Sequence, residues 1–158
     1  MRSPPMILVV EDNRAAREIL EARLAASGYE VLTAKDGRTG LQLARERRPD
    51  LILLDIMMPK MDGIEVCRRL KTDATLPFIP VIMLTAKAEA EDIVAGLEAG
   101  SDEYLTKPVN QAALVARVKS MLRIKALQDT VAAQAAQLET QLKTAAKIQT
   151  LFWPQMPK

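Results

Sequence analysis

Five short apolar runs alternate with amphipathic segments, and this alternation constrains the fold more than any other feature of the sequence. Some of the runs have almost no polar residue, as in strands buried on both faces of a sheet. The predicted strands span residues 6–10, 29–34, 51–55, 79–85 and 103–106. The predicted helices span residues 13–26, 36–47, 63–71 and 89–99, and a further helix opens near residue 110. This repeat predicts an α/β fold with a parallel sheet and helices on both of its faces.

Local signals mark the ends of the first helix. Asn13 can cap its start, and Gly28 can end it. We expect Ile19, Leu20 and Leu24 to lie on one side of this helix. The pair Asp62-Gly63 is predicted to form a turn and a helix start, with no chemical role.

The sequence has no histidine, and this excludes several classes of site. No Ser-His-Asp triad, Cys-His pair, imidazole zinc ligand or histidine base is available. The single Cys67 can form neither an internal disulfide nor a cysteine metal site, and we interpret it as inert packing on a helix. Any metal site would use oxygen ligands and a hard ion such as Mg²⁺ or Ca²⁺.

Charge and hydropathy set few further limits. Residues 1–120 carry 17 basic and 18 acidic side chains, and residues 121–158 carry 5 and 2. Neither part is basic enough to indicate nucleic-acid binding. No apolar run approaches the roughly 20 residues of a membrane-spanning helix, and the run after MRSPPM is too short for a signal peptide. We therefore expect a cytoplasmic protein with no nucleic-acid or membrane partner.

Polar side chains directly follow four of the predicted strands. Glu11 and Asp12 follow the first strand, Asp55 and Thr85 end the third and fourth, and Lys107 follows the fifth. Ligands of open parallel sheets bind beyond the carboxyl ends of the strands, where these residues would meet. Clustered carboxylates raise each other's pKa unless a cation neutralises them. We therefore expect a Mg²⁺ ion here, with Lys107 supplying further positive charge.

Four motifs in this order resemble the receiver domain of two-component response regulators. They are VVED (9–12), LLDIMMPKMDG (53–63), MLTA (83–86) and YLTKP (104–108). The resemblance covers roughly residues 6–120. It implies a doubly wound, flavodoxin-like sheet of five parallel strands in the order 2-1-3-4-5. We assign residues 1–122 to a receiver domain and residues 123–158 to a long helical linker or coiled coil that leads to an output domain.

The resemblance also implies a function and a set of residue roles. Asp55 would accept a phosphoryl group from a phosphohistidine on a sensor histidine kinase or a phosphotransfer protein, as a nucleophilic carboxylate. Asp12, Asp55 and the backbone carbonyl of Met57 would bind Mg²⁺ directly, and Glu11 would bind it through water. Lys107 would neutralise charge on the transferring phosphoryl group. Such a protein is a signalling switch and not an enzyme with ordinary turnover.

Thr85 and Tyr104 form the switch that the resemblance implies. Thr85 would hydrogen-bond a phosphoryl oxygen, and Tyr104 would then move inward to fill the space that Thr85 leaves. A plain half-buried aromatic residue is an equally weighted interpretation of Tyr104. The bond between Lys107 and Pro108 is usually cis in this family, which aims the lysine.

Two residues depart from the usual pattern of the family. Glu11 stands where most members have aspartate, and its extra methylene is compatible with a contact through water. Met57 offers no polar side chain near an attacking water, so we expect a long-lived acyl phosphate. Loss of phosphate within seconds would contradict that expectation.

Other functions fit the residues less well. A phosphohydrolase of the haloacid dehalogenase type needs a second aspartate two residues after the nucleophile, where this chain has Met57. A flavodoxin-like cofactor binder would need a phosphate loop in place of the acidic segment 11–17. The remaining alternative is a receiver-fold scaffold or dimerisation module that phosphorylation does not regulate. The 38 residues after the body leave no room for a helix-turn-helix unit.

The C-terminal part is predicted to form one long helix. No glycine or proline occurs from Asn110 to Trp153, and Pro154 and Pro157 would end the helix. Its first part should pack on the sheet through Leu114, Val115, Val118 and Leu122. Beyond about Arg123 we expect the helix to leave the body. Its apolar residues there recur mostly every three, four or seven positions, which predicts a parallel coiled coil, with a frayed linker as the alternative.

The end of this helix resembles two kinds of linker. The segment AAKIQTLFWPQMP is similar to the lead-in of PPM-type phosphatases, and LQDTVAAQAAQLE is similar to linkers before nucleotide cyclase domains. Neither resemblance decides the output domain. We expect a homodimer, formed through the long helix, through the face of the fourth helix, fifth strand and fifth helix, or through both.

Overall fold

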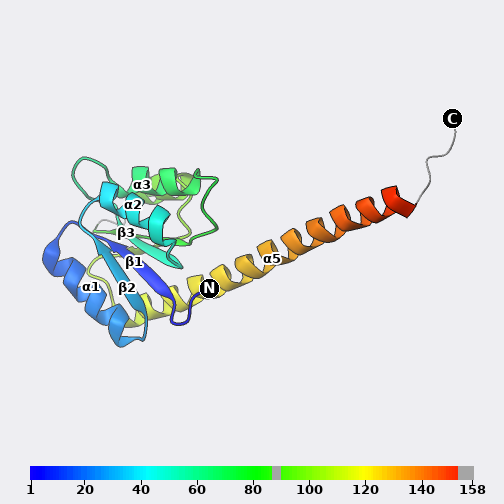
Figure 1. Cartoon of the computed structure of the whole chain (residues 1–158). Coiled ribbons are helices and arrows are strands. Elements are labelled where there is room, and N and C mark those ends of the chain that lie inside the picture. The colour runs from blue at the N-terminus through cyan, green and yellow to red at the C-terminus, as the bar shows by residue number, and fades with distance from the viewer. Residues whose placement is uncertain (87–89, 153–158) are drawn as a thin grey trace.

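The structure is a five-stranded parallel sheet in the order β2-β1-β3-β4-β5, which confirms the predicted fold class (Figure 1). Its strands are β1 Met6–Val10, β2 Glu30–Ala34, β3 Leu51–Asp55, β4 Val81–Thr85 and β5 Glu103–Thr106. Its helices are α1 Arg14–Ala26, α2 Gly37–Arg47, α3 Gly63–Lys71, α4 Ala90–Glu98 and α5 Gln111–Phe152. This computed structural model describes residues 1–86 and 90–152 of the chain.

A separate hydrophobic core covers each face of the sheet. Successive side chains of a strand point to opposite faces, so the apolar run of β3 serves both cores. Leu54 packs in the core under α2 and α3, with Val66, whereas Leu53 packs in the core under α1 and α5, with Leu20 and Val118. The three central strands β1, β3 and β4 are therefore buried on both faces, as their apolar runs predicted.

The strand register brings the carboxyl ends of the central strands to one edge. Val10 of β1 lies beside Leu54 of β3, and Asp55 lies beside Leu84 of β4. Thr85 in turn lies beside Thr106 of β5. The residues that follow these strands are therefore neighbours in space although they are far apart in the sequence.

Side-chain caps hold the starts of several helices at this edge, among them α2, where Asp36 accepts from the Thr39 N–H. The Asn13 side-chain oxygen accepts a hydrogen bond from the Ala16 N–H at 2.9 Å, and Asp62 accepts one from the Glu65 N–H at 2.9 Å. Asn110 caps α5 in the same way. Each cap satisfies a backbone donor that the first helical turn leaves free. The predicted roles of Asn13 and of Asp62 in starting helices are thus confirmed.

Several predicted boundaries shift by one or two residues. The strand predicted from residue 79 begins at Val81, because Pro80 has no N–H for the strand ladder. The strand predicted from residue 29 begins at Glu30. The helix predicted over 89–99 is observed as Ala90–Glu98, and Glu89 lies outside the described residues.

Of the three apolar residues expected on one side of α1, Ile19 is the one that is not buried. Leu20 and Leu24 are buried, but Ile19 is 51% exposed. Leu20 and Leu24 are four residues apart and share one side of the helix. Ile19 lies one residue away from that row, so its side chain turns toward solvent.

Helix α5 packs on the sheet over its first turns and then leaves the body (Figure 1). Leu114, Val118 and Leu122 are buried as predicted, and Val115 is half-buried. Burial continues two residues beyond the predicted point, because Lys125 is only 4% exposed. Residues 130–149 are all exposed. The predicted helix end at Trp153, Pro154 and Pro157 lies outside the described residues.

Among the helices of residues 1–86 and 90–152, none combines the length and the apolar character that a membrane span requires.

Candidate functional site

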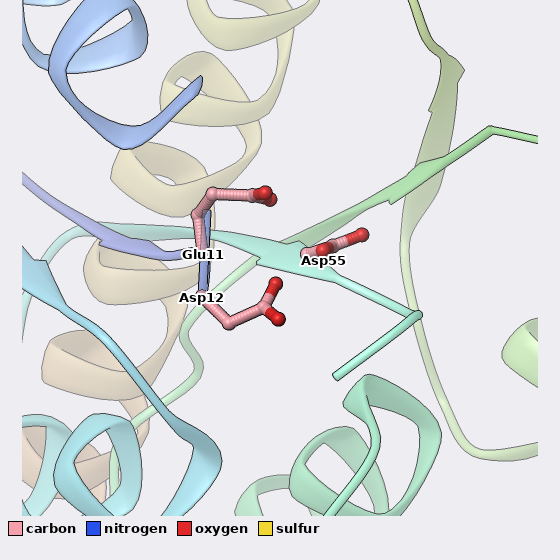
Figure 2. A group of neighbouring side chains, drawn as sticks. All are labelled: Glu11, Asp12 and Asp55. Carbon is pink, nitrogen blue, oxygen red and sulfur yellow. The ribbon is translucent and has the colours of Figure 1, made fainter. Parts of the chain in front are cut away.

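Three carboxylates meet at the carboxyl edge of the sheet. Glu11 and Asp12 come from the end of β1 and Asp55 from the end of β3, and Figure 2 shows the three side chains on one side of the strand ends. One carboxylate oxygen from each lies within 4.8 Å of the others. Glu11 and Asp55 are buried, whereas Asp12 is exposed. The predicted convergence of these residues is therefore observed.

Lys107 is the cation that faces this cluster. Its Nζ lies 2.9 Å from Glu11 Oε2 and 3.3 Å from Asp55 Oδ1. Its backbone N–H donates to the Thr85 carbonyl at 2.7 Å, and the Lys107–Pro108 peptide bond is cis, as predicted. The direct ion pair between Lys107 and Glu11 was not predicted from the sequence, because the two residues are 96 positions apart.

The environment of Asp55 disfavours its charged form. Burial and then the neighbouring Glu11 raise the pKa of Asp55 to about 7, although Lys107 acts in the opposite direction. Burial alone would lower the pKa of Lys107, but its contacts with Glu11 and Asp55 outweigh burial and raise that pKa. A further cation at the site would therefore stabilise the charged form of Asp55.

The loop after β3 places Asp55 through backbone contacts. The Met57 N–H donates to Asp55 Oδ1 at 3.3 Å, and the Gly63 N–H donates to the Ile56 carbonyl at 3.0 Å. A Cβ atom on Gly63 would lie 2.2 Å from the Asp55 carbonyl oxygen, so only glycine fits there. This role of Gly63 was not predicted from the sequence. The Met57 side chain is 68% exposed, so it does not pack in the core.

Thr85 and Tyr104 lie on neighbouring strands beside the cluster. Thr85 ends β4 and is only 2% exposed, and β4 is the strand next to that of Asp55. Tyr104 of β5 lies opposite Met83 of β4 and is 38% exposed. The tyrosine side chain is therefore on the outside of the edge strand, two residues along the ladder from Thr85.

An apolar groove adjoins the site, and it was not predicted from the sequence. It is lined mainly by Ile19 and Leu20 of α1 and by Lys107, Pro108 and Val109 of the loop before α5. The Arg23 guanidinium crosses from α1 to donate to the Val109 carbonyl at 2.9 Å, which holds the two walls together. The exposed Ile19 could have signalled this groove, because it interrupts an otherwise polar helix surface.

The residues at the cluster fit a hard divalent cation. Three carboxylates face one lysine, so the fully ionised cluster has an excess of negative charge. Carboxylate and carbonyl oxygens are the ligands that Mg²⁺ prefers, and it keeps several waters. Glu11, Asp12 and Asp55 supply such carboxylate oxygens at the sheet edge.

The fold and this set of strand-end residues define a class of protein. The chain belongs to the response regulator receiver domain family, whose model matches residues 7–119. Receiver domains are generally signalling modules and not enzymes, and they take phosphate from histidine kinases or phosphotransfer proteins. Members of the family bind Mg²⁺ at the acidic pocket.

Particular relatives include full-length regulators. The chain is 50% identical over 123 residues to the response regulator PleD of Caulobacter vibrioides, covering 78% of this chain and 27% of PleD. It is 49% identical over 117 residues to the alkaline phosphatase synthesis transcriptional regulatory protein PhoP of Bacillus subtilis, covering 74% of this chain and 48% of PhoP. The chain thus spans about a quarter to a half of these relatives.

Solved structures agree with this assignment. The chemotaxis protein CheY4 of Vibrio cholerae superposes with a TM-score of 0.71 at 32% identity, covering 74% of this chain and 98% of that one. The signal receiver domain of a modulated diguanylate cyclase from Desulfovibrio desulfuricans G20 superposes with a TM-score of 0.69 at 32% identity, covering 78% and 98%.

Proposed function

We propose that this chain is a phosphoaspartate-controlled switch, in which Asp55 accepts a phosphoryl group from a sensor histidine kinase or phosphotransfer protein. The position of Asp55 carries the proposal. It is buried at the end of β3, with the Lys107 Nζ 3.3 Å away and two further carboxylates beside it. Lys107 and a cation bound by the carboxylates would offset the charge of an incoming phosphoryl group, so this cluster fits a phosphoryl acceptor better than a scaffold.

The transfer step uses residues of this chain in separate roles. An Asp55 carboxylate oxygen bonds to phosphorus while the phosphorus–nitrogen bond of the donor imidazole breaks, and the electron pair returns to that nitrogen. In this proposal Lys107, which contacts Asp55, neutralises charge that develops on the phosphoryl oxygens, and the Thr85 hydroxyl donates to one of them. Mg²⁺, held by Asp12, Asp55, the Met57 carbonyl and, through water, Glu11, would neutralise further phosphoryl charge.

Incubation with acetyl phosphate and Mg²⁺ tests the proposal. The wild-type chain is expected to gain the mass of one phosphoryl group, and Asp55→Asn is expected to gain none, because an amide is a poor nucleophile. Asp62→Asn is the matched control, since asparagine also caps helices, and it should still be modified. An unmodified wild-type chain would remove Asp55 as the acceptor and favour the scaffold alternative.

The groove beside Lys107 supports docking of the phosphoryl donor at this edge. Its lining is mostly apolar, and Ile19 offers an exposed aliphatic side chain on α1. A donor protein that delivers a phosphohistidine to Asp55 must contact the surface around the site. An apolar patch at that position can bury area on the donor without placing charge beside the acidic cluster.

Ile19→Ser is expected to slow transfer from a donor protein about tenfold, since it removes a central apolar contact. An autophosphorylated histidine kinase that modifies the wild-type chain provides the assay. Acetyl phosphate should modify the variant at the wild-type rate, because this small donor does not use the groove. Val94→Ser on α4 removes a similarly exposed aliphatic side chain and should transfer normally. Equal rates for Ile19→Ser and wild type with the kinase would rule out docking in this groove.

Transmission of the signal completes the proposed function. Thr85 and Tyr104 are the proposed switch, and their neighbouring strands support a concerted movement. The output domain would be a PPM-type phosphatase or a nucleotide cyclase, and the similarity to the receiver of a diguanylate cyclase supports the second. A homodimer would transmit the conformational change of the switch to the output domain. It would form through α5, through the α4–β5–α5 face, or through both. The α4–β5–α5 face is supported by three exposed large side chains on it, Val94, Leu97 and Tyr104. We propose a cytoplasmic location.

A further inference from the structure

Helix α5 carries large apolar side chains that nothing in the described chain covers. Six of them are 38–62% exposed: Ile124, Leu127, Val131, Leu138, Leu142 and Ile148. Every residue from 130 to 149 is exposed, and Figure 1 shows this part of the helix projecting away from the body. Most helices owe their stability to the packing of an apolar face, and this segment has no packing partner in its own chain.

Seven of the residues on this helix form a narrow stripe. We define the α5 stripe as Ile124, Leu127, Val131, Ala135, Leu138, Leu142 and Ala145, with successive spacings of 3, 4, 4, 3, 4 and 3. A helix turns by about 100° per residue, so the stripe is roughly 80° wide along its whole length. From Ile124 to Leu142 the mean spacing equals the period of a straight helix, so pairing along it requires little supercoiling.

A regular heptad from the same start would pass through different residues. Strict alternation of three and four positions from Val131 would place Gln134 and Gln141 in the seam, in place of Ala135 and Leu142. Two buried glutamine layers need hydrogen-bond partners, and the α5 stripe avoids this requirement. The straight stripe is therefore the more favourable contact surface.

The α5 stripe faces away from the body of the protein. Val118, Leu122 and Lys125 mark the side of the helix that packs on the body. The centre of the stripe lies roughly 150° round the helix from that side. Two copies can therefore pair along their stripes with their bodies on the outside of a two-helix stem.

The low charge of the projecting helix and the position of the body favour a second copy in parallel orientation. Residues 130–149 carry only Glu139, Lys143 and Lys147, and Glu139 pairs with Lys143 in its own helix at 3.4 Å. Few like charges would therefore face each other in a symmetric pair. An antiparallel pair centred on the α5 stripe would run residues 146–152 of each copy beside residues 117–123 of the other, where α5 packs on the body. A parallel pair places both bodies at one end of the stem and keeps these residues clear of them (Figure 1).

We propose that α5 pairs in parallel and in register with α5 of a second copy along the α5 stripe. This inference gives the proposed homodimer a defined seam. The stripe covers about 33 Å of helix, and a strip about 10 Å wide gives a contact area at the low end for specific interfaces. The pair is therefore expected to dissociate on dilution.

Single cysteine substitutions test the seam, because a disulfide requires Cβ atoms about 3.5–4.5 Å apart. Leu142→Cys is the stripe variant, Gln141→Cys lies in the alternative heptad seam, and Thr140→Cys lies on the outer side. Ala135→Cys is a second stripe variant that removes no large side chain. The native Cys67 is buried and its thiol pKa is raised to about 11, so it should not react. Each variant is incubated in a glutathione redox buffer, and wild type is followed by sedimentation over a range of concentrations.

The expected result is disulfide dimers of Leu142→Cys and Ala135→Cys that form about tenfold faster than those of Gln141→Cys. Thr140→Cys should stay monomeric, and wild type should dimerise as its concentration rises. Faster cross-linking of Gln141→Cys, or equal cross-linking of Thr140→Cys, would overturn the proposed seam. A wild type that stays monomeric throughout would overturn the pairing. Acetyl phosphate modification of Asp55 is measured separately, so failure of the dimer is distinguishable from failure of the proposed switch.

Discussion

Asp55→Asn is expected to stabilise the metal-free protein by about 2–4 kcal/mol at pH 8. The ordinary pKa of an aspartate is about 4, and burial beside Glu11 raises the pKa of Asp55 to about 7. The folded protein therefore binds this proton more tightly than the unfolded chain does. Wild-type stability should fall as the pH rises from about 4 through 7, and the neutral asparagine does not contribute to this loss.

Urea unfolding in the presence of a chelator measures this effect. The stability difference between Asp55→Asn and wild type should be small near pH 4 and largest above pH 7. Addition of Mg²⁺ should narrow it, because an ion that binds only the folded wild type stabilises it. The exposed Asp62→Asn removes one surface charge and should change stability by less than about 0.5 kcal/mol. A difference that stays constant with pH would contradict the assigned environment of Asp55.

Gly63→Ala is expected to destabilise the fold by about 3 kcal/mol or more. The new Cβ would lie 2.2 Å from the Asp55 carbonyl oxygen and 2.9 Å from the Ile56 Cα. These are backbone atoms, so they can move away only if the end of β3 shifts. The same shift would displace the Asp55 carboxylate, and we expect phosphoryl uptake from acetyl phosphate to fall with stability.

Gly96→Ala is the matched control for this substitution. Gly96 lies within α4, where a new Cβ would meet its nearest atom, the Ser101 Oγ, at 3.5 Å, an ordinary contact. Alanine is a better helix former than glycine, so this variant should be neutral or more stable by up to about 1 kcal/mol. Thermal unfolding of both variants and of wild type measures the change in stability. Equal stability of the two would show that Gly63 is not needed for close approach.

Most of the fold could be predicted because its signals are local. The apolar run of β3 predicts a strand buried on both faces, since both of its alternating sets of side chains are apolar. The caps at Asn13 and Asp62 depend on residues three positions away. The convergence of Asp12 and Asp55 followed from the parallel sheet, because strand ends in such a sheet share one edge.

The finer geometry of the site depended on contacts between distant segments. The sequence indicated a water-mediated metal contact for Glu11, and the structure adds a direct ion pair with Lys107. The need for glycine at position 63 depends on where the end of β3 passes relative to α3. Exposure of Ile19 beside Pro108 depends on how α1 is rotated on the sheet. None of these features has a repeat or spacing that the sequence could reveal.

The sequence by itself determined the order of strands and helices, the caps and the polar residues at the strand ends, because hydrophobic periodicity and capping act over a few residues. Only the tertiary structure decided the pairing of Lys107, the raised pKa of Asp55 and the point where α5 leaves the body. These properties depend on distance and burial among segments that are up to 96 residues apart. Folding sets such distances through strand register and helix packing, which a local pattern does not specify.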